Sequence, residues 1–241
     1  MDVSQGYREA WEGYWSSISG APGEAIWDSD PSLTSVPHSE LLLPHADASL
    51  PVVDLGCGNG TQTRYLATVF TRAIGVDLSH AAIGHARRAD SAGVAEFEQL
   101  NLVDGDAVQA LRERIGDTNV YMRAVIHQSE PEARPAVAAA IATLLGARGR
   151  AFVAELTPAS KTVLQQAAQA PGGPPEKLRR VFEHGLRPAS ATQEEVPELL
   201  RAAGLTTLAS GDTALAQTEH LPDGTRIDLP ARWFVLAAAD R

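Results

Sequence analysis

The chain has 241 residues, a length that suits one α/β domain. Hydrophobic residues make up 44% of it, which is enough for a full core and argues against disorder. The formal net charge is −10 and lysine occurs only at Lys161 and Lys177, so the composition argues against a nucleic-acid partner. Cys57 is the only cysteine, which excludes a disulfide within the chain.

Two further features bear on where the protein works. The amino terminus lacks the basic segment and apolar run of a signal peptide. The most apolar predicted helix, near residues 136–145, is about ten residues long and too short to span a bilayer. We therefore expect a cytoplasmic protein without a membrane partner, and the sequence leaves its oligomeric state open.

The first predicted element is a helix over residues 5–19 with an aromatic stripe on one face. A loop rich in Pro, Gly, Asp and Ser follows, with Trp27 and Asp28 inside it. We expect residues 1–48 to form an N-terminal helical cap. The stripe consists of Tyr7, Trp11, Tyr14, Trp15 and Ile18.

The most informative stretch is residues 51–60, Pro-Val-Val-Asp-Leu-Gly-Cys-Gly-Asn-Gly. A short apolar run ends at Asp54, and glycines then alternate at Gly56, Gly58 and Gly60. This pattern predicts a buried strand that turns abruptly into a helix. Glycine lets the backbone approach a ligand where a Cβ would collide, and the first N–H groups of the helix face that ligand. The stretch therefore predicts a site for a nucleotide-like molecule.

Two kinds of ligand compete for this loop. A dinucleotide fold has the pattern G-x-G-x-x-G, but Thr61 stands at the third glycine position here. Asp54 would also repel a pyrophosphate, whereas it would attract an amine or a sulfonium. S-adenosylmethionine carries both of these cations and no phosphate. The remaining alternative for the loop is a glycine turn that binds no ligand. Cys57 within the loop is interpreted as a small residue that fills space.

The next predicted strand, Ala73-Ile74-Gly75-Val76, ends at Asp77. The segment between Gly60 and Asp77 is long enough for one helix and for the chain to return to the sheet. An acidic residue at this position binds both ribose hydroxyls with its two oxygens in dinucleotide folds, and we expect the same of Asp77. The alternative is that Asp77 caps the following helix, for which Ser79 is the expected N-cap.

Strands and helices are predicted to alternate through the centre of the chain. The alternation predicts one α/β domain over residues 1–241, with a doubly wound, Rossmann-like, mostly parallel seven-stranded sheet and helices on both faces. Ligands of such folds bind at the carboxyl ends of the strands, where Asp54, Asp77, Asn101, Arg123 and Glu155 are expected. The predicted segments are 51–55, 60–69, 72–76, 79–91, 95–99, 107–115, 119–123, 131–145 and 149–155.

Residues 156–192 interrupt this alternation. The segment is rich in proline and contains Gly172-Gly173. It is expected to hold helices at 159–169 and 175–184 and to form a lid or pocket wall over the substrate, because it leaves the carboxyl end of a strand.

The carboxyl-terminal part completes the sheet. A helix over 193–203 is expected to begin at Thr192, with Glu195 forming a capping box. Two strands, near 205–210 and 231–237, are expected to end the sheet as an antiparallel pair. Residues 211–230 between them are interpreted as a polar excursion that turns at Asp223-Gly224.

Five segments resemble, in order, the motifs of class I S-adenosylmethionine-dependent methyltransferases, from about residue 50 to residue 155. The chain departs from the family pattern where Asn101 and Asn119 replace Asp, and Asn101 can still contact an adenine amine through its side-chain oxygen. The segments are Asp54-Leu55-Gly56-Cys57-Gly58-Asn59-Gly60, Ile74-Gly75-Val76-Asp77-Leu78-Ser79, Phe97-Glu98-Gln99-Leu100-Asn101-Leu102, Asn119-Val120-Tyr121-Met122-Arg123-Ala124-Val125-Ile126-His127 and Gly149-Arg150-Ala151-Phe152-Val153-Ala154-Glu155.

The resemblance implies S-adenosylmethionine as cofactor and methyl transfer as activity. The aromatic helix, loop and Trp27-Asp28 before the first strand are also similar to the amino-terminal extension of thiopurine-type methyltransferases, which implies a helix over the cofactor. The alternatives are an aromatic stripe that only packs on the sheet and a surface role for Arg123. The residues expected to bind the cofactor are Trp27, Asp54, Gly56, Cys57, Gly58, Gly60, Asp77, Leu78, Asn101, Leu102 and Arg123.

His127 is the candidate catalytic residue, because an alcohol or phenol must lose a proton to accept a methyl group. It lies just beyond the fourth strand, where the methyl end of the cofactor is expected to point. A structural histidine that bonds a loop carbonyl is the alternative. His184 and His220 are weaker candidates, and Glu155 is expected to bond a substrate hydroxyl or to brace the lid. No cluster of His, Cys, Asp or Glu has metal-ligand spacing.

The favoured function is transfer of the methyl group to an O, N or C atom of a small, partly apolar organic molecule, such as a specialised metabolite. The alternatives are a protein or nucleic-acid methyltransferase and a non-catalytic protein that binds S-adenosylmethionine. The negative charge argues against nucleic acid, and the Asn/Asp-Pro-Pro-Tyr/Phe motif of amino-group methylation is absent after the fourth predicted strand, where Arg123-Ala124-Val125-Ile126 stands.

Overall fold

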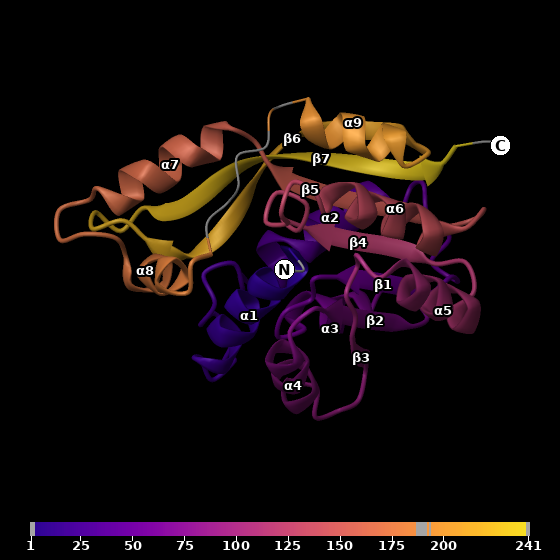
Figure 1. The fold of residues 1–241 in the computed structure, drawn as a ribbon, viewed down its shortest axis with the longest axis horizontal. Coiled ribbons are helices and arrows are strands. Elements are labelled where there is room, and N and C mark those ends of the chain that lie inside the picture. Colours follow the sequence, from indigo (N-terminus) through magenta and orange to yellow (C-terminus); the bar gives the residue numbers. More distant parts are fainter. Residues whose placement is uncertain (1–2, 187–191, 193, 240–241) are drawn as a thin grey trace.

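The computed structural model describes residues 3–186, 192 and 194–239. Within them, seven strands form one sheet in the order β3-β2-β1-β4-β5-β7-β6 (Figure 1). Strands β1 to β5 are parallel, whereas β7 is antiparallel to both β5 and β6, so the predicted fold class is confirmed. The strands are β1 (Val52–Leu55), β2 (Ala73–Asp77), β3 (Glu96–Gln99), β4 (Asn119–Arg123), β5 (Arg150–Leu156), β6 (Leu205–His220) and β7 (Arg226–Ala238).

Helices cover both faces of the sheet, which explains why its central strands are apolar at successive positions. In β5, Val153 packs into the core on one face, while Phe152 and Ala154 pack into the core on the other. The first face is covered by α5 (Gly105–Ile115), α6 (Arg134–Leu145) and α9 (Glu195–Ala202), and the second by α2 (Ser35–Leu42), α3 (Thr61–Leu66) and α4 (His80–Ala89).

Helix α2 and the short 3-10 helix η1 (Pro31–Leu33) occupy a stretch for which the sequence predicted only a loop. Apolar periodicity does not mark α2, because its buried side chains are largely polar, and two of them make hydrogen bonds. Ser35 donates to Gln62 Oε1 over 2.7 Å, and His38 Nδ1 lies 2.9 Å from the Tyr121 hydroxyl. These contacts attach the N-terminal segment to the sheet.

The hairpin of β6 and β7 is longer than predicted, and the polar excursion expected at 211–230 is wrong. The two strands pair as far as His220 and Arg226, with register shifts along β6. Ile227 and Leu229 of the far half pack into a second cluster, whereas Leu215 packs into the sheet core, and this division hides the strand pattern in the sequence. The turn at Asp223-Gly224 lies where predicted, since Asp223 Oδ1 accepts from Thr225 N over 2.9 Å.

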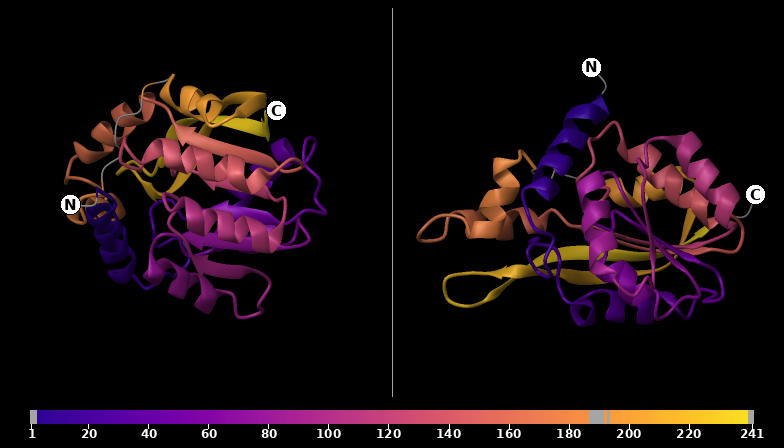
Figure 2. Two further views of the ribbon diagram at one scale, coloured as in Figure 1. Left: turned by 45° about the vertical axis from the view of Figure 1, so that its right-hand side comes forward. Right: turned by 90° about the horizontal axis from the view of Figure 1, so that it is seen from below.

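This second cluster, the cap cluster, lies at the carboxyl ends of the parallel strands (Figures 1 and 2). It joins the tip of the hairpin to α1 (Val3–Ser16), α7 (Ala159–Ala168) and α8 (Glu176–Glu183). Its buried members are Tyr14, Trp15, Ile18, Ala25, Ile26, Ala82, Ala167, Leu178, Val181, Leu186, Ile227 and Leu229.

The two predicted helices of the 156–192 segment are present as α7 and α8, and residues 187–191 of that segment lie outside the described residues. Helix α9 begins at Glu195, whose Oε2 accepts from Thr192 N over 3.3 Å, one half of the predicted capping box. Residue 193, where the helix was expected to begin, also lies outside the described residues. In the part of the chain that the structure describes, no helix is long and apolar enough to cross a bilayer.

Candidate functional site

The glycine loop, residues 56–60, joins β1 to α3 by a sharp turn. The N–H groups of Gly56 and Cys57 donate to Val76 O over 2.8 and 3.0 Å, which holds the loop against β2. Gly58 has a φ of +56°, and a Cβ there would lie 2.7 Å from the Trp15 ring. The loop therefore requires glycine at position 58 for its backbone and for the close approach of α1.

Gly60 differs from the other two predicted glycines, because it does not line the cavity described below. A Cβ at this position would lie 2.5 Å from the Phe97 ring. Packing between the loop and β3 therefore accounts for glycine here.

Two carboxylates lie at the ends of neighbouring strands. Asp77 accepts hydrogen bonds from Gly58 N and Ser79 N, each over 2.9 Å, so the carboxylate spans the glycine loop and the start of α4. Asp54 accepts from the Thr63 hydroxyl over 2.6 Å. Ser79 also caps α4, as expected, by accepting from Ala82 N over 3.1 Å.

Burial raises the pKa of both carboxyl groups above their ordinary value, to about 6. The Thr63 hydroxyl and Arg123 act against this shift at Asp54, and the N–H groups of Ser79 and Gly58 act against it at Asp77. A cation bound near these groups would favour their ionised forms. The pair therefore forms a site for a positively charged, phosphate-free ligand.

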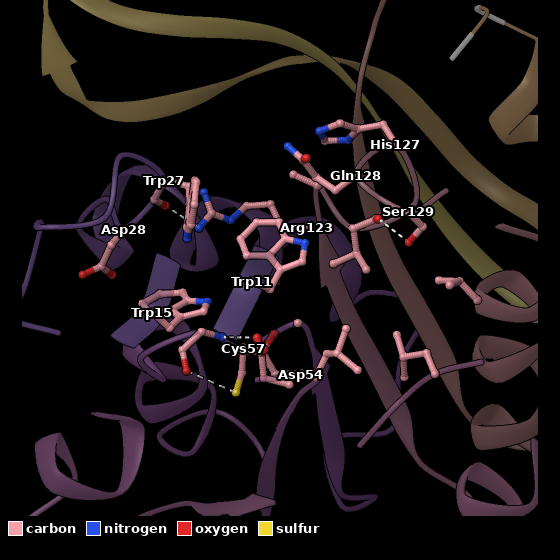
Figure 3. Close-up of a pocket in the computed structure, with 18 of the residues that line it drawn as sticks. Trp11, Trp15, Trp27, Asp28, Asp54, Cys57, Arg123, His127, Gln128 and Ser129 are labelled. Atoms are coloured by element: carbon pink, nitrogen blue, oxygen red, sulfur yellow. Dashed lines mark hydrogen bonds between the residues drawn. The ribbon is translucent and has the colours of Figure 1, made fainter. Parts of the chain in front are cut away.

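The predicted cofactor-binding residues come together around one cavity at the carboxyl ends of β1, β2 and β4. Gly60 is the exception. Figure 3 shows Trp11 and Arg123 between His127 on one side of this cavity and Asp54 and Cys57 on the other. The predicted residues that line it are Trp27, Asp54, Gly56, Cys57, Gly58, Asp77, Leu78, Asn101, Leu102 and Arg123, together with His127.

Arg123 links the sheet to the N-terminal cap. Its Nη2 donates to Trp27 O over 2.7 Å, which fixes the loop before η1 at the end of β4 (Figure 3). Asn59 makes a second link, since its Nδ2 donates to Asp28 Oδ2 over 2.7 Å. The guanidinium of Arg123 uses one of its N–H groups to hold the cap and also lines the cavity.

Asn101 lies in a turn after β3. Its side-chain oxygen accepts from Val103 N over 3.1 Å, which orients the amide at the edge of the cavity. Leu78, Leu100 and Leu102 line the same edge and supply the apolar surface that an adenine ring requires.

Helix α1 lies over the glycine loop. Glu12 accepts from the Ser79 hydroxyl over 2.7 Å and thereby fixes α1 to the start of α4. Trp11 and Trp27 meet edge to face with ring centroids 5.3 Å apart, and both line the cavity. Tyr7 lines it as well, and burial raises the pKa of its hydroxyl above the ordinary value, so the phenol stays neutral.

The far part of the cavity, which we name the acceptor chamber, is mostly apolar. Helices α7 and α8 and the β6–β7 hairpin form its walls, so the segment predicted as a lid contributes side chains here. Gln217 of β6 adds a polar group, and its Nε2 donates to Leu215 O over 2.9 Å. The apolar members are Leu156, Leu164, Leu178, Val181, Phe182, Leu215 and Leu229.

His127 faces the cavity from the loop after β4. Its Nδ1 lies 2.6 Å from Glu155 Oε2, and its Nε2 is buried without a partner among the described residues. Glu155 is 1% exposed and does not line the cavity. Glu155 is therefore not placed to bond a substrate hydroxyl, and its carboxylate accepts hydrogen bonds from residues 125–127. His184 and His220 do not line the cavity either.

Sequence reasoning missed several residues at the cavity. Asn59 and Gln62 sit in or beside the glycine loop, and their links to the cap have no signature in the sequence. The chamber residues of α8 and β7 lie far from the motifs along the chain, so spacing gives no signal for them. No group of three or more His, Cys, Asp or Glu side chains in the described ranges could hold a metal ion.

Comparison with known proteins agrees with this geometry. Residues 52–149 match the methyltransferase domain family. A SAM-dependent methyltransferase from Anabaena variabilis ATCC 29413 is 29% identical, with 96% of this chain and 94% of that chain covered and a TM-score of 0.88. The matched domain and this similarity support a class I SAM-dependent methyltransferase. Its cofactor is S-adenosylmethionine, and no curated protein matches the chain.

Two more distant structures show the same fold for this methyltransferase. One was solved in work on conversion of a disulfide bond into a thioacetal group during echinomycin biosynthesis; it is 20% identical, covers 96% of this chain and 92% of its own, and has a TM-score of 0.68. The other is magnesium protoporphyrin IX methyltransferase from Synechocystis PCC 6803 with bound SAH, at 18% identity, 86% and 82% coverage and a TM-score of 0.55.

Proposed function

We propose that the protein transfers the methyl group of S-adenosylmethionine to an atom of a small, partly apolar organic molecule held in the acceptor chamber. One observation carries the proposal: a single cavity is lined by the carboxylate pair Asp54 and Asp77, by the apolar side chains of the chamber and by His127, whose Nε2 has no partner among the described residues. When bound, the cofactor supplies an activated methyl group on a sulfonium.

The residues around the carboxylates fit this cofactor. Asp77 is proposed to accept both ribose hydroxyls, because each of its oxygens carries one backbone N–H bond and retains a free lone pair. Asp54 balances the positive charge of the ligand. Asn101, Leu78 and Leu102 are proposed to hold the adenine, and the loop of Gly56, Cys57 and Gly58 lies beside the methionine part.

His127 is proposed to act on the acceptor. Its side chain is 3% exposed, it lines the cavity, and its Nε2 has no partner among the described residues, so this nitrogen is proposed to take a proton from an acceptor atom. The reaction also requires that the acceptor atom is held in line with the methyl carbon. The walls of the chamber are proposed to hold the acceptor in this position.

A small acceptor agrees best with how the chamber is covered. Trp11 and Trp27 close it from α1 and the following loop, and Leu178 and Leu229 close it from α8 and the hairpin. A folded protein or a duplex would have to displace these buried side chains. The net charge of −10 further disfavours a nucleic acid.

The test is an assay of methyl transfer with purified protein. S-adenosylmethionine is incubated with a library of small apolar hydroxyl, amine and carbon nucleophiles, and in parallel with bulk tRNA and protein. Formation of S-adenosylhomocysteine together with a methylated small molecule supports the proposal. Methylation of tRNA or protein alone contradicts it.

A further inference from the structure

Glu155 is surrounded by hydrogen-bond donors. Its Oε1 accepts from Val125 N and Ile126 N over 2.9 and 2.8 Å, and its Oε2 accepts from His127 N over 3.1 Å. The fourth contact is His127 Nδ1, at 2.6 Å. The three backbone N–H groups can only donate, and hydrogen bonds of this kind favour the ionised form of a carboxyl group, which can only accept. The arrangement therefore belongs to an ionised carboxylate.

The carboxylate determines where the proton of His127 resides. An ionised Glu155 can only accept, so Nδ1 must carry the hydrogen that joins the two groups. In neutral imidazole the other nitrogen is then a bare acceptor. That nitrogen, Nε2, is buried without a partner among the described residues, and His127 is one of the residues that line the cavity. His127 is thus held as a base and not as a donor.

The charges around the chamber restrict what can give up this proton. Asp54 and Asp77 line the cavity, and Glu155 lies directly behind His127. Among the described lining residues, Arg123 is the one side chain with a fixed positive charge, and it donates to Trp27 O. An anionic acceptor would lose its hydration in a largely apolar enclosure and face these carboxylates, with only Arg123 and the bound donor to offset its charge.

A cationic acceptor is disfavoured for a different reason. An ammonium would lose its hydration among Leu178, Val181, Phe182 and Leu229, and it would also face the sulfonium of the donor. A neutral hydroxyl avoids both costs. A hydroxyl acceptor also requires a base to take its proton, whereas a carboxylate acceptor is already ionised and requires no base.

We propose that the methyl acceptor is the hydroxyl of a neutral, largely apolar molecule, and that Glu155 is a positioning residue that holds His127 in the Nδ1–H form so that Nε2 receives the hydroxyl proton. The inference rests on the proposed function. A lone pair of the hydroxyl oxygen forms the new bond to carbon, the electron pair of the C–S bond stays on sulfur, and the proton moves to Nε2.

The tautomer is measured without any acceptor. Protein with ¹⁵N-labelled histidine is examined by NMR at mildly alkaline pH, and a His127→Gln variant assigns the resonance. A hydrogen on Nδ1 and a bare Nε2 are expected. A hydrogen on Nε2, or on both nitrogens, overturns the proposal.

Glu155→Gln tests the positioning role. The amide can donate to Nδ1 and thus move the hydrogen to Nε2. We expect kcat to fall at least about 100-fold, with KM for the donor unchanged and a changed tautomer in the NMR spectrum. Asp90→Asn is the matched control, because Asp90 is a buried carboxylate that also accepts backbone N–H groups, from Val94 and Ala95, away from the cavity. A normal kcat for Glu155→Gln overturns the positioning role.

The acceptor class is tested with three matched series on the same aromatic or aliphatic skeletons: hydroxyl, amine and carboxylate compounds. Methylation within the hydroxyl series supports the inference, and turnover confined to amines or carboxylates overturns it. A protein that binds the donor but methylates no member of any series contradicts the proposed function, while the NMR result still decides the tautomer.

Discussion

The floor and the roof of the cavity are built in different ways. The floor consists of the glycine loop and the carboxylates at the ends of β1 and β2, and backbone hydrogen bonds fix its groups. The roof is the cap cluster, where side chains from α1, α7, α8 and the hairpin pack together. We therefore propose that the floor selects the cofactor and that the roof shapes the space for the acceptor.

The largest effect is expected at His127, in the loop after β4. In His127→Ala, kcat falls by about 10²- to 10⁴-fold, because proton transfer loses its base. The dissociation constant of S-adenosylmethionine, measured by calorimetry, stays unchanged. His220→Ala is the control, since His220 does not line the cavity. Near-normal turnover of His127→Ala would assign His127 a structural role.

Gly58→Ala tests how closely the roof rests on the floor. The new Cβ would lie 2.7 Å from Trp15 in a backbone with a φ of +56°. We expect a loss of about 2–4 kcal/mol in the free energy of unfolding, from overpacking and backbone strain together. The loss is measured by denaturant titration.

Gly93→Ala separates the two contributions. Gly93 has a φ of +64°, and a Cβ there meets nothing within 4 Å. This variant should lose only about 1 kcal/mol, the strain alone. Equal losses for Gly58→Ala and Gly93→Ala would show that the contact with Trp15 carries no energy.

Asp77→Ala tests the floor alone. Binding of S-adenosylmethionine should weaken by about 1–3 kcal/mol, the loss expected when hydrogen bonds to a charged group are removed. Asp104→Ala is the matched control, because Asp104 caps α5 by accepting from Ala107 N over 3.0 Å and does not line the cavity. An unchanged dissociation constant for Asp77→Ala argues against the ribose assignment.

The smallest expected effect is on pH dependence. Burial raises the pKa of Asp54 and Asp77 from the ordinary 3.8 to about 6, so between these values the folded protein holds more protons than the unfolded one. These two groups therefore lower the stability of the ligand-free protein as the pH rises through that window.

Binding of the cationic donor should strengthen over the same range, because both carboxyls become ionised as the pH passes about 6. Calorimetry across this range measures the change. In Asp54→Asn the dependence should weaken. An affinity that does not change with pH would show that the two carboxylates do not interact with the charge of the ligand.

The contrast between floor and roof also explains what the sequence could predict. Asp54, Gly56, Gly58 and Asp77 lie at fixed positions relative to strand ends, and parallel strands bring such ends to one edge. The alternation of strands and helices therefore predicted the sheet. Of the eleven cofactor candidates named from the sequence, ten line the cavity. Gly60 was grouped with them on pattern alone, and its neighbour Phe97 is 37 residues away in the chain.

The roof was predictable only in part. The aromatic stripe of α1 indicated a cap, but Leu178 and Leu229 reach the chamber through tertiary packing that has no period in the sequence. The far half of the hairpin was taken for a loop because its strands bury side chains in the cap cluster. The role of Glu155 depends on backbone N–H groups at 125–127, which only the folded loop brings together.

The central claim is that one cavity holds the donor on the carboxylate floor and directs its methyl group toward His127. A crystal structure of the complex with S-adenosylhomocysteine tests this directly. The account predicts the ribose hydroxyls on Asp77 and the sulfur open to the chamber on the side of His127 Nε2. A ribose away from Asp77, or a sulfur shielded from His127, would contradict it.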